Sequence, residues 1–228
     1  MTPLLLEKLA DLRADWVPIE LAEFVVVGSV LDLIPSNNWS GTVLGAGLLH
    51  EEGHPNLLRA NVLAIRGKLT ARRVKARNHN FALGDPGLLC SEIIPEPEKK
   101  YDLTVVPHWS DYDLANRFAH LNPHVIDPET DTAAVVSDIA ASRKIVASSL
   151  HGIVVADSYR IPRRAEQFAG INSSYEGGEF KYHDYASVLN EKMKWGVLHT
   201  PKERFVEKAQ AELFDAFRSI ASKKPKKR

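Results

Sequence analysis

The stretch best suited to chemistry is a histidine placed just after an apolar run and two serines. Residues 144–157 read KIVASSLHGIVVAD, which predicts a buried strand, a cap formed by Ser148 and Ser149, and a helix with His151 in its first turn. Free backbone N–H groups and the positive end of the helix dipole favour a phosphate or carboxylate there. An imidazole so placed can also act as a general acid, because its pKa lies near neutrality. The alternative is a capped helix whose histidine only packs.

Further polar and glycine residues follow predicted strands elsewhere in the chain. Gly28-Ser29 follows the first strand, Gly45-Ala46-Gly47 the second, and His108-Trp109 the fifth. In open α/β sheets, ligands bind in the crevice outside the carboxyl ends of the strands. We therefore expect these positions to face one crevice together with His151.

The elements that must position these residues follow an α/β pattern. Short β-branched runs alternate with helical patterns, which predicts parallel strands covered by helices. The expected strands are 24–27, 42–44, 62–65, 81–83, 103–106, 124–126, 144–147 and 165–168. Capping residues predict helices over 110–121 and from Thr130-Asp131 to about Ser142. Thr200-Pro201 begins a long amphipathic helix, whose apolar stripe is Phe205, Ala209, Leu213 and Phe217.

A linker composition divides the chain. Residues 95–100 read PEPEKK, proline-rich and charged, which is typical of a linker and not of a core element. We therefore expect a Rossmann-like domain at 1–94, a linker at 95–100, a second Rossmann-like domain at 101–199, a helix at 200–222 and a basic tail at 223–228.

Charge and composition exclude several classes of protein. The 228 residues are 44% hydrophobic, and 29 basic side chains balance 29 acidic ones, so no net field attracts the chain to nucleic acid. The single cysteine, Cys90, excludes a disulfide framework and fits a reducing cytoplasm. No apolar run approaches the roughly 18 residues of a membrane span. Membrane contact is therefore expected to be peripheral at most, through the basic tail.

One apparent metal motif is expected to be inactive. His50-Glu51-Glu52-Gly53-His54 matches the H-E-x-x-H pattern of zinc hydrolases. That pattern needs a helix to bring both histidines to one ion, whereas Gly53 and Pro55 disfavour a helix here. We therefore expect no metal site.

The segment from Lys144 to Pro162 resembles the signature of polysaccharide pyruvyl transferases, particularly those acting on succinoglycan- and xanthan-like polymers. Six other segments agree in order: VGSVL at 27–31, VLGAG at 43–47, IRGKLT at 65–70, ALGDPGLL at 82–89, VVPH at 105–108 and FKYHDY at 180–185. Each segment is weak alone. Their joint order over roughly residues 20–190 carries the resemblance.

The resemblance implies a fold and an activity. The family is similar in fold to GT-B glycosyltransferases, with two tandem Rossmann-like domains and a last helix that packs back on the first domain. It transfers the pyruvyl group of phosphoenolpyruvate to a sugar of an exopolysaccharide or cell-wall glycan as a ketal. For this chain the resemblance implies a cytoplasmic enzyme, or one at the inner face of the plasma membrane. Phosphoenolpyruvate would be the co-substrate without a further cofactor, and a glycan or lipid-linked oligosaccharide the acceptor. A metal requirement and homo-oligomer formation stay open.

The resemblance also implies residue roles. His151 is the acid, Arg66 clamps the anionic donor with its guanidinium fork, and His108 contacts the sugar or assists proton transfer. The implied donor site also contains Ser148, Ser149, Gly152, Gly28 and Ser29, and the implied acceptor side contains Gly45, Gly47, Trp109, Lys181 and Asp184.

Each of these assignments has an alternative in which the residue has only a structural role. Arg66 can instead pair with a surface acid, and His108 can pack between the domains. Lys181 and Asp184 can equally be surface residues. Asp85, in Gly84-Asp85-Pro86-Gly87, is expected only to stabilise its own turn.

Two departures from the family pattern keep other functions open. Ser149 stands where relatives carry an arginine before the Leu-His pair, and the chain begins at a helix that in the family follows a first strand and an Asn-Phe-Gly-Asp type loop. A GT-B glycosyltransferase that uses a nucleotide sugar, and an inactive glycan-binding homologue, therefore remain as alternatives.

Overall fold

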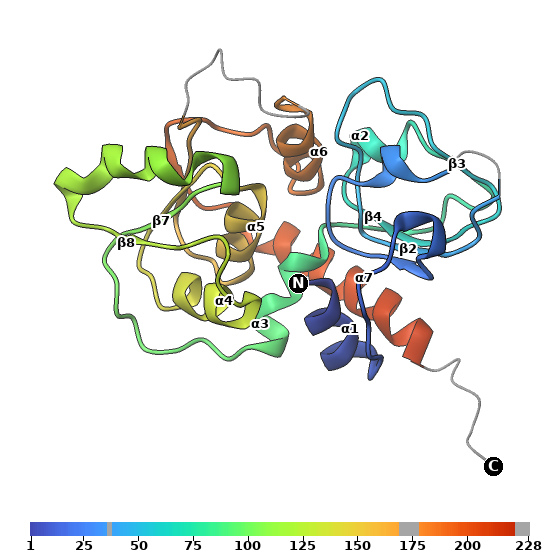
Figure 1. Ribbon diagram of the computed structural model, residues 1–228, viewed down its shortest axis with the longest axis horizontal. Coiled ribbons are helices and arrows are strands. Elements are labelled where there is room, and N and C mark those ends of the chain that lie inside the picture. The colour runs from blue at the N-terminus through green and yellow to red at the C-terminus, as the bar shows by residue number, and fades with distance from the viewer. Residues whose placement is uncertain (36–37, 169–177, 222–228) are drawn as a thin grey trace.

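The protein is an α/β structure built around two mainly parallel sheets (Figure 1). The computed structural model describes residues 1–35, 38–168 and 178–221. The basic tail at 223–228 lies outside the described residues. Within them, no helix combines the length and apolar composition needed to cross a bilayer.

The first sheet is formed by residues 24–83. Its strands are β1 (Phe24–Val25), β2 (Thr42–Leu44), β4 (Asn61–Ile65) and β6 (Ala82–Leu83), in the spatial order β1-β2-β4-β6 and all parallel. A separate parallel pair joins β3 (Asn56–Leu57) to β5 (Lys75–Ala76). Because all four strands of the first sheet are parallel, their carboxyl ends lie at the same edge.

The second sheet is formed by residues 104–199. Its strands are β7 (Thr104–Val106), β8 (His124–Val125), β9 (Ile145–Ala147), β10 (Arg163–Ala165) and β11 (Leu198–His199). The spatial order is β11-β10-β9-β7-β8, and only β11 runs antiparallel to its neighbour. The chain leaves β7 toward one edge to form β8 and then returns to the other side of β7 for β9. The direction of the strand order therefore reverses between β7 and β9, which is a topological switch point.

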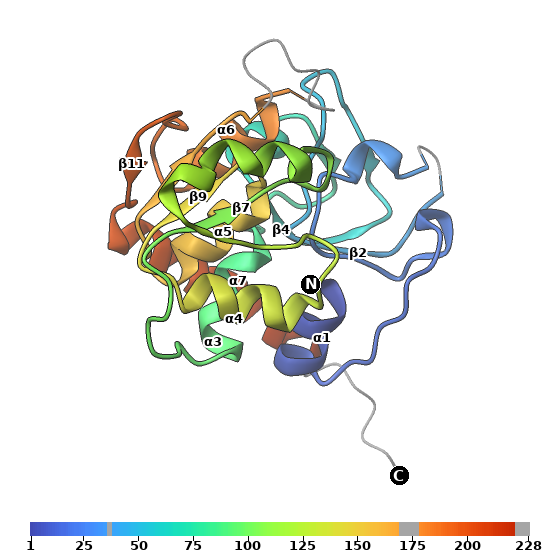
Figure 2. The same ribbon diagram turned by 60° about the vertical axis from the view of Figure 1, so that its left-hand side comes forward.

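Helices cover these sheets. The α-helices are α1 (Thr2–Ala10), α2 (Lys68–Ala71), α3 (Cys90–Ile93), α4 (Thr132–Ala140), α5 (Leu150–Ser158), α6 (Phe180–Val188) and α7 (Glu203–Ala221). The 3₁₀-helices are η1 (Ile19–Leu21), η2 (Leu31–Leu33), η3 (Pro86–Leu89) and η4 (Trp109–Leu121). Figure 2 shows η4 on one side of β7 and β9 and α4 on the other.

One hydrophobic core runs through both sheets. It contains Leu44 and Ala64 of the first sheet, Val106 and Ala147 of the second, and residues of α1, α5 and α7. Two smaller clusters lie on the outer faces, because successive side chains of a strand point to opposite faces. The expected linker at 95–100 has no helix or strand, although the core is continuous across the elements on either side.

Two expected elements differ in the structure. The strand expected at 165–168 is β10 at Arg163–Ala165, because these three residues pair with Ile145–Ala147 of β9. The Arg163 side chain is buried there, 3.0 Å from Asp157. The α-helix expected from Ser110 is the 3₁₀-helix η4, capped by His108. The Ser110 hydroxyl contacts the His108 ring at 2.8 Å, so it does not serve as the predicted cap.

Candidate active site at the carboxyl ends of the two sheets

His151 is the second residue of α5, as the sequence predicts. Ser149 caps the helix, and its Oγ accepts the N–H of Gly152 at 3.4 Å. Gly152 allows α5 to approach β7, since a Cβ at this position would lie 2.7 Å from Cγ1 of Val106. The imidazole is therefore held at the start of a buried nine-residue helix, where free N–H groups and the helix dipole favour an anion.

The switch point brings two of the predicted groups together. His108 follows β7, and Ser148 follows β9, the neighbouring strand. The Ser148 Oγ accepts the backbone N–H of His108 at 2.9 Å, which ties the two strand ends to each other. His108 and His151 thus belong to the pair of strand ends at which open α/β sheets bind ligands.

An aspartate of the first sheet reaches the same point. Asp85 follows β6 and is fully buried, and its Oδ2 lies 3.7 Å from Nε2 of His151. Both atoms are buried and have no hydrogen-bond partner among the described residues. The His151 side chain as a whole is 37% exposed, so its accessible surface belongs to atoms other than Nε2.

The surroundings of His151 are positively charged. Burial is the main reason that its pKa is lowered below the ordinary value of 6.5, and the Asp85 carboxylate opposes this effect. The charges of Arg66, the Met1 amino group and Lys181 lower the pKa further. Two cationic side chains therefore act on the imidazole, in addition to the helix dipole.

Arg66 follows β4 of the first sheet and links it to α6 through a buried ion pair. Its side chain has no exposed surface, and its Nε donates to Oδ2 of Asp184 on α6 at 3.0 Å. The two Nη groups donate to the Ser29 hydroxyl and to the carbonyl oxygen of Leu48. Each guanidinium nitrogen thus donates one hydrogen bond within the protein, and the charge of the group lowers the pKa of His151.

Asp184, the partner of Arg66 on α6, is fully buried, and Lys181 on the same helix is largely buried. The Asp184 carboxylate also accepts the backbone N–H of Thr70 at 2.8 Å and the Thr70 hydroxyl at 2.6 Å. Lys181, which is 8% exposed, places Nζ 5.4 Å from the ring centre of Tyr182. These two residues therefore lie in the interior beside the candidate site and not on an open acceptor face.

The remaining predicted positions divide into close-packed glycines and an exposed aromatic residue. A Cβ on Gly45 would lie 2.4 Å from Pro86, and one on Gly47 would lie 2.4 Å from Cζ of Arg66. Gly28 adopts a φ of +123°, which favours glycine. Trp109 is 71% exposed, with its ring centre 5.7 Å from that of His108.

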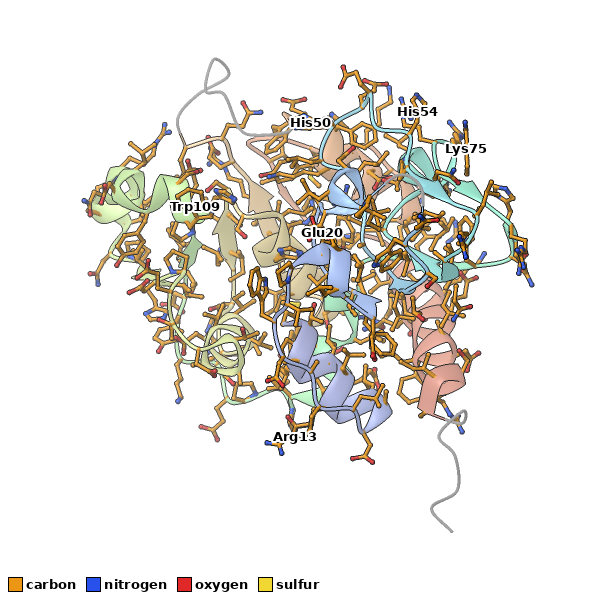
Figure 3. The ribbon with its side chains drawn as sticks, turned by 45° about the vertical axis from the view of Figure 1, so that its right-hand side comes forward. Arg13, Glu20, His50, His54, Lys75 and Trp109 are labelled. Carbon is orange, nitrogen blue, oxygen red and sulfur yellow. The ribbon has the colours of Figure 1, made fainter. Side chains whose placement is uncertain are left out.

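The H-E-x-x-H stretch forms a turn, which is the conformation that its glycine and proline favour. Figure 3 shows His50 and His54 at separate points of this loop. Among the described residues, no group of three or more histidine, cysteine, aspartate or glutamate side chains is arranged to hold a metal ion.

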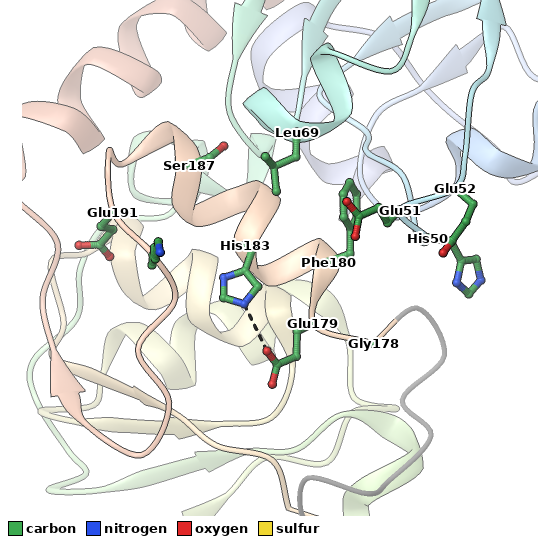
Figure 4. Close-up of a pocket in the computed structure, with 11 residues that line it drawn as sticks. His50, Glu51, Glu52, Leu69, Gly178, Glu179, Phe180, His183, Ser187 and Glu191 are labelled. Atoms are coloured by element: carbon green, nitrogen blue, oxygen red, sulfur yellow. Dashed lines mark hydrogen bonds and ion pairs between the residues drawn. The ribbon is translucent and has the colours of Figure 1, made fainter.

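A cavity of about 770 Å³ lies on a different part of the molecule (Figure 4). It runs between the loop at residues 50–52 and the outer face of α6, where His183 pairs with Glu179 at 3.2 Å. None of the predicted site residues lines it. This cavity and the His151 cluster are therefore separate features.

Sequence comparisons place the chain among its relatives. No protein-family model matches it. The "Uncharacterized protein L143" of Acanthamoeba polyphaga mimivirus is 30% identical over 198 residues, which cover 80% of this chain and 67% of that protein. The chain belongs to the family of this mimivirus protein. Outside viruses, the chain is similar to the "Succinoglycan biosynthesis protein ExoV" of Rhizobium meliloti (strain 1021), at 29% identity over 194 residues. That alignment covers 78% of the chain and 55% of the rhizobial protein, so the chain spans about half of that relative's length.

The contact between Asp85 and His151 was not predicted from the sequence. The sequence signal was present, because Asp85 follows a strand as the other site residues do. The sequence Asp-Pro-Gly also favours a turn, and the Oδ1 atom of Asp85 does accept the N–H of Gly87 at 2.9 Å. Only the three-dimensional packing shows that the second carboxylate oxygen faces His151.

Proposed function

We propose that the chain transfers the pyruvyl group of phosphoenolpyruvate to a sugar of an exopolysaccharide or cell-wall glycan, forming a ketal. The observation that carries this proposal is His151, a partly exposed imidazole at the start of α5, with two buried cations acting on it. The similarity to a rhizobial protein of succinoglycan biosynthesis supports a glycan-synthesis role. The GT-B-like arrangement of two tandem Rossmann-like domains is part of the same proposal.

The proposed reaction assigns His151 the role of acid. The imidazolium protonates the methylene carbon of phosphoenolpyruvate, and the adjacent carbon, which becomes electron-deficient, is attacked by two sugar hydroxyls while its bond to phosphate breaks. Of the two hydroxyl protons, one ends on the new methyl group in the net reaction and the other on the released phosphate. The acid is therefore regenerated.

We assign binding of the anionic donor to backbone N–H groups of α5 and to nearby positive charges. The free N–H groups of α5 receive phosphate or carboxylate oxygens, and Lys181 adds positive charge. Arg66 contributes as a fixed charge, because its donors already bind Asp184, Ser29 and Leu48. We assign the exposed Trp109 ring, beside His108, to the apolar face of the acceptor sugar.

The test is release of inorganic phosphate from phosphoenolpyruvate that depends on an acceptor. Succinoglycan oligosaccharides freed of their pyruvyl ketals serve as the acceptor, and His151→Gln should abolish release. His120→Gln is the matched control, because His120 is exposed on η4 away from the strand ends. Tight binding of UDP or GDP in calorimetry, with no binding of phosphoenolpyruvate, would instead favour a nucleotide-sugar glycosyltransferase. Glycan binding without turnover, unchanged in His151→Gln, would identify a binding homologue.

A further inference from the structure

Two buried polar atoms that face each other lack partners at the candidate site. They are Oδ2 of Asp85, from the first sheet, and Nε2 of His151, from the second. Buried polar atoms are almost always hydrogen-bonded, and an unpaired one is destabilising. The two atoms are 3.7 Å apart, which is within ion-pair distance and slightly longer than a hydrogen bond. A direct hydrogen bond between the two side chains would satisfy both atoms.

Turn formation does not explain the position of this carboxylate. The Asp85 turn uses Oδ1, which accepts from Gly87 N, and leaves Oδ2 unused. Asp127, in the sequence Asp-Pro-Glu, makes the same contact through Oδ1 with Glu129 N at 2.9 Å, yet Asp127 is exposed. An Asp-Pro turn therefore requires neither burial nor a histidine neighbour.

Packing holds the two side chains opposite each other. Gly45 contacts Pro86 so closely that a Cβ would lie 2.4 Å from the proline ring, and a Cβ on Gly87 would lie 3.0 Å from Cγ1 of Val154 in α5. The Asp85 turn is thus fixed between β2 and α5. A small rotation of either side chain closes the remaining distance.

We propose that Asp85 is the positioning residue of His151: its Oδ2 accepts a hydrogen bond from Nε2–H and thereby fixes the ring with its exposed edge toward the donor. This inference rests on the proposed function, in which His151 protonates the donor. A carboxylate on one ring nitrogen sets the tautomer and stabilises the imidazolium, and such contacts tighten when the substrate complex forms.

The kinetic test compares Asp85→Asn with Asp127→Asn. Asparagine keeps an Oδ1 acceptor for the turn and replaces the charged Oδ2 acceptor with an Nδ2 donor, which cannot accept from Nε2–H. We expect kcat for phosphate release to fall by about 10- to 10⁴-fold in Asp85→Asn, with KM for phosphoenolpyruvate little changed, since about 10⁴-fold is lost when the carboxylate behind a catalytic histidine becomes an amide. Asp127→Asn alters the same kind of turn at an exposed aspartate that is not among the charges acting on His151, so it should keep the wild-type kcat. Equal effects of both substitutions would show that Asp85 acts only through its turn.

The second readout is independent of activity. The ring of His151 is titrated by NMR in histidine-labelled wild type and Asp85→Asn, and its signal is assigned with His151→Gln. The charged groups that act on this ring are Asp85, Arg66, Lys181 and the Met1 amino group. Of these only Asp85 raises the pKa, so the pKa should be lower in Asp85→Asn than in wild type. The high-pH limb of the kcat profile should move to lower pH by the same amount.

The two readouts separate failure of this inference from failure of the proposed function. If wild type releases no phosphate with any acceptor, the proposed function is wrong, and the titration alone decides whether Asp85 and His151 form a pair. An unchanged pKa of His151 in Asp85→Asn overturns the inference, as does unchanged kcat in an active enzyme.

Discussion

At the scale of single residues, His151 combines partial exposure with a lowered pKa, and that combination has a consequence for stability. Because the folded state holds the ring with a lowered pKa, it binds fewer protons than the unfolded chain, whose histidine titrates near 6.5. The stability that the neutral ring contributes is present above that pH. It is lost as the pH falls through the lowered pKa of the folded state.

We therefore expect wild type to lose more stability than His151→Gln when the pH is lowered from neutrality. Urea unfolding at a series of pH values measures the free energy of unfolding of each protein. His120→Gln should follow wild type, because His120 is exposed. Parallel curves for wild type and His151→Gln would contradict the lowered pKa.

Cys90 gives a second prediction at this scale. The thiol is fully buried, and burial, reinforced by the Asp85 charge, raises its pKa to about 12. The thiolate is the reactive form, so the folded protein should not react with a disulfide reagent at pH 8. One thiol per chain should react in guanidinium chloride, since Cys90 is the single cysteine. Rapid reaction of the native protein would show that the region around α3 opens.

At the scale of elements, the contact between α2 and α6 depends on the buried pair of Arg66 and Asp184. Replacing Arg66 with methionine leaves the Asp184 carboxylate buried without its charge partner. We expect a loss of about 3–5 kcal/mol in the free energy of unfolding, measured by urea titration. The matched control is Arg143→Met, whose partner Asp102 is 96% exposed, and that change should cost about 0–1 kcal/mol.

Gly67 allows the same two helices to approach. A Cβ at Gly67 would lie 2.0 Å from the backbone oxygen of Asp184, so Gly67→Ala must push α6 away from α2. We expect a loss of about 1–3 kcal/mol from this overpacking. Gly196→Ala is the control for backbone strain alone, because Gly196 has a φ of +68° and no neighbour within 4 Å of the added carbon. It should cost about 1 kcal/mol. A loss well below about 1 kcal/mol in Gly67→Ala would argue against close packing at Gly67.

The helices and strands differ in how far the sequence predicts them. Strands and caps that rest on local chemistry were predictable: Thr42–Leu44 is a strand, and Asp131 caps α4. Elements stabilised by distant charge partners were not. Arg163 is buried in β10 with Asp157 3.0 Å away, and Arg66 is buried with Asp184, which lies 118 residues further along the chain. Local patterns do not contain such pairings, and the orientation of Asp85 toward His151 depends on packing of the same kind.

At the scale of the whole molecule, α7 joins the end of the described chain to the first sheet. It packs on α1, η3, β4 and β6, and its stripe of Ala209, Leu213 and Phe217 is buried in the main core. Figure 1 shows α7 beside α1 and beneath the first sheet. Because that core also contains strands of the second sheet, loss of α7 packing should destabilise both sheets.

Leu213→Ala tests this coupling. Leu213 is fully buried, and its Cδ1 lies 2.7 Å from the position of a Cβ on Gly84, so its truncation leaves a cavity beside β6. We expect a loss of about 2–5 kcal/mol, against a smaller loss of about 1 kcal/mol for Phe214→Ala, since Phe214 is 37% exposed on the same helix. Variants that retain only Trp39, in the cluster on the outer face of the first sheet, or only Trp195, beside β10, report on each sheet by fluorescence. A shared core requires both tryptophans to show the same shift in midpoint. A shift confined to Trp39 would mean that the sheets unfold separately.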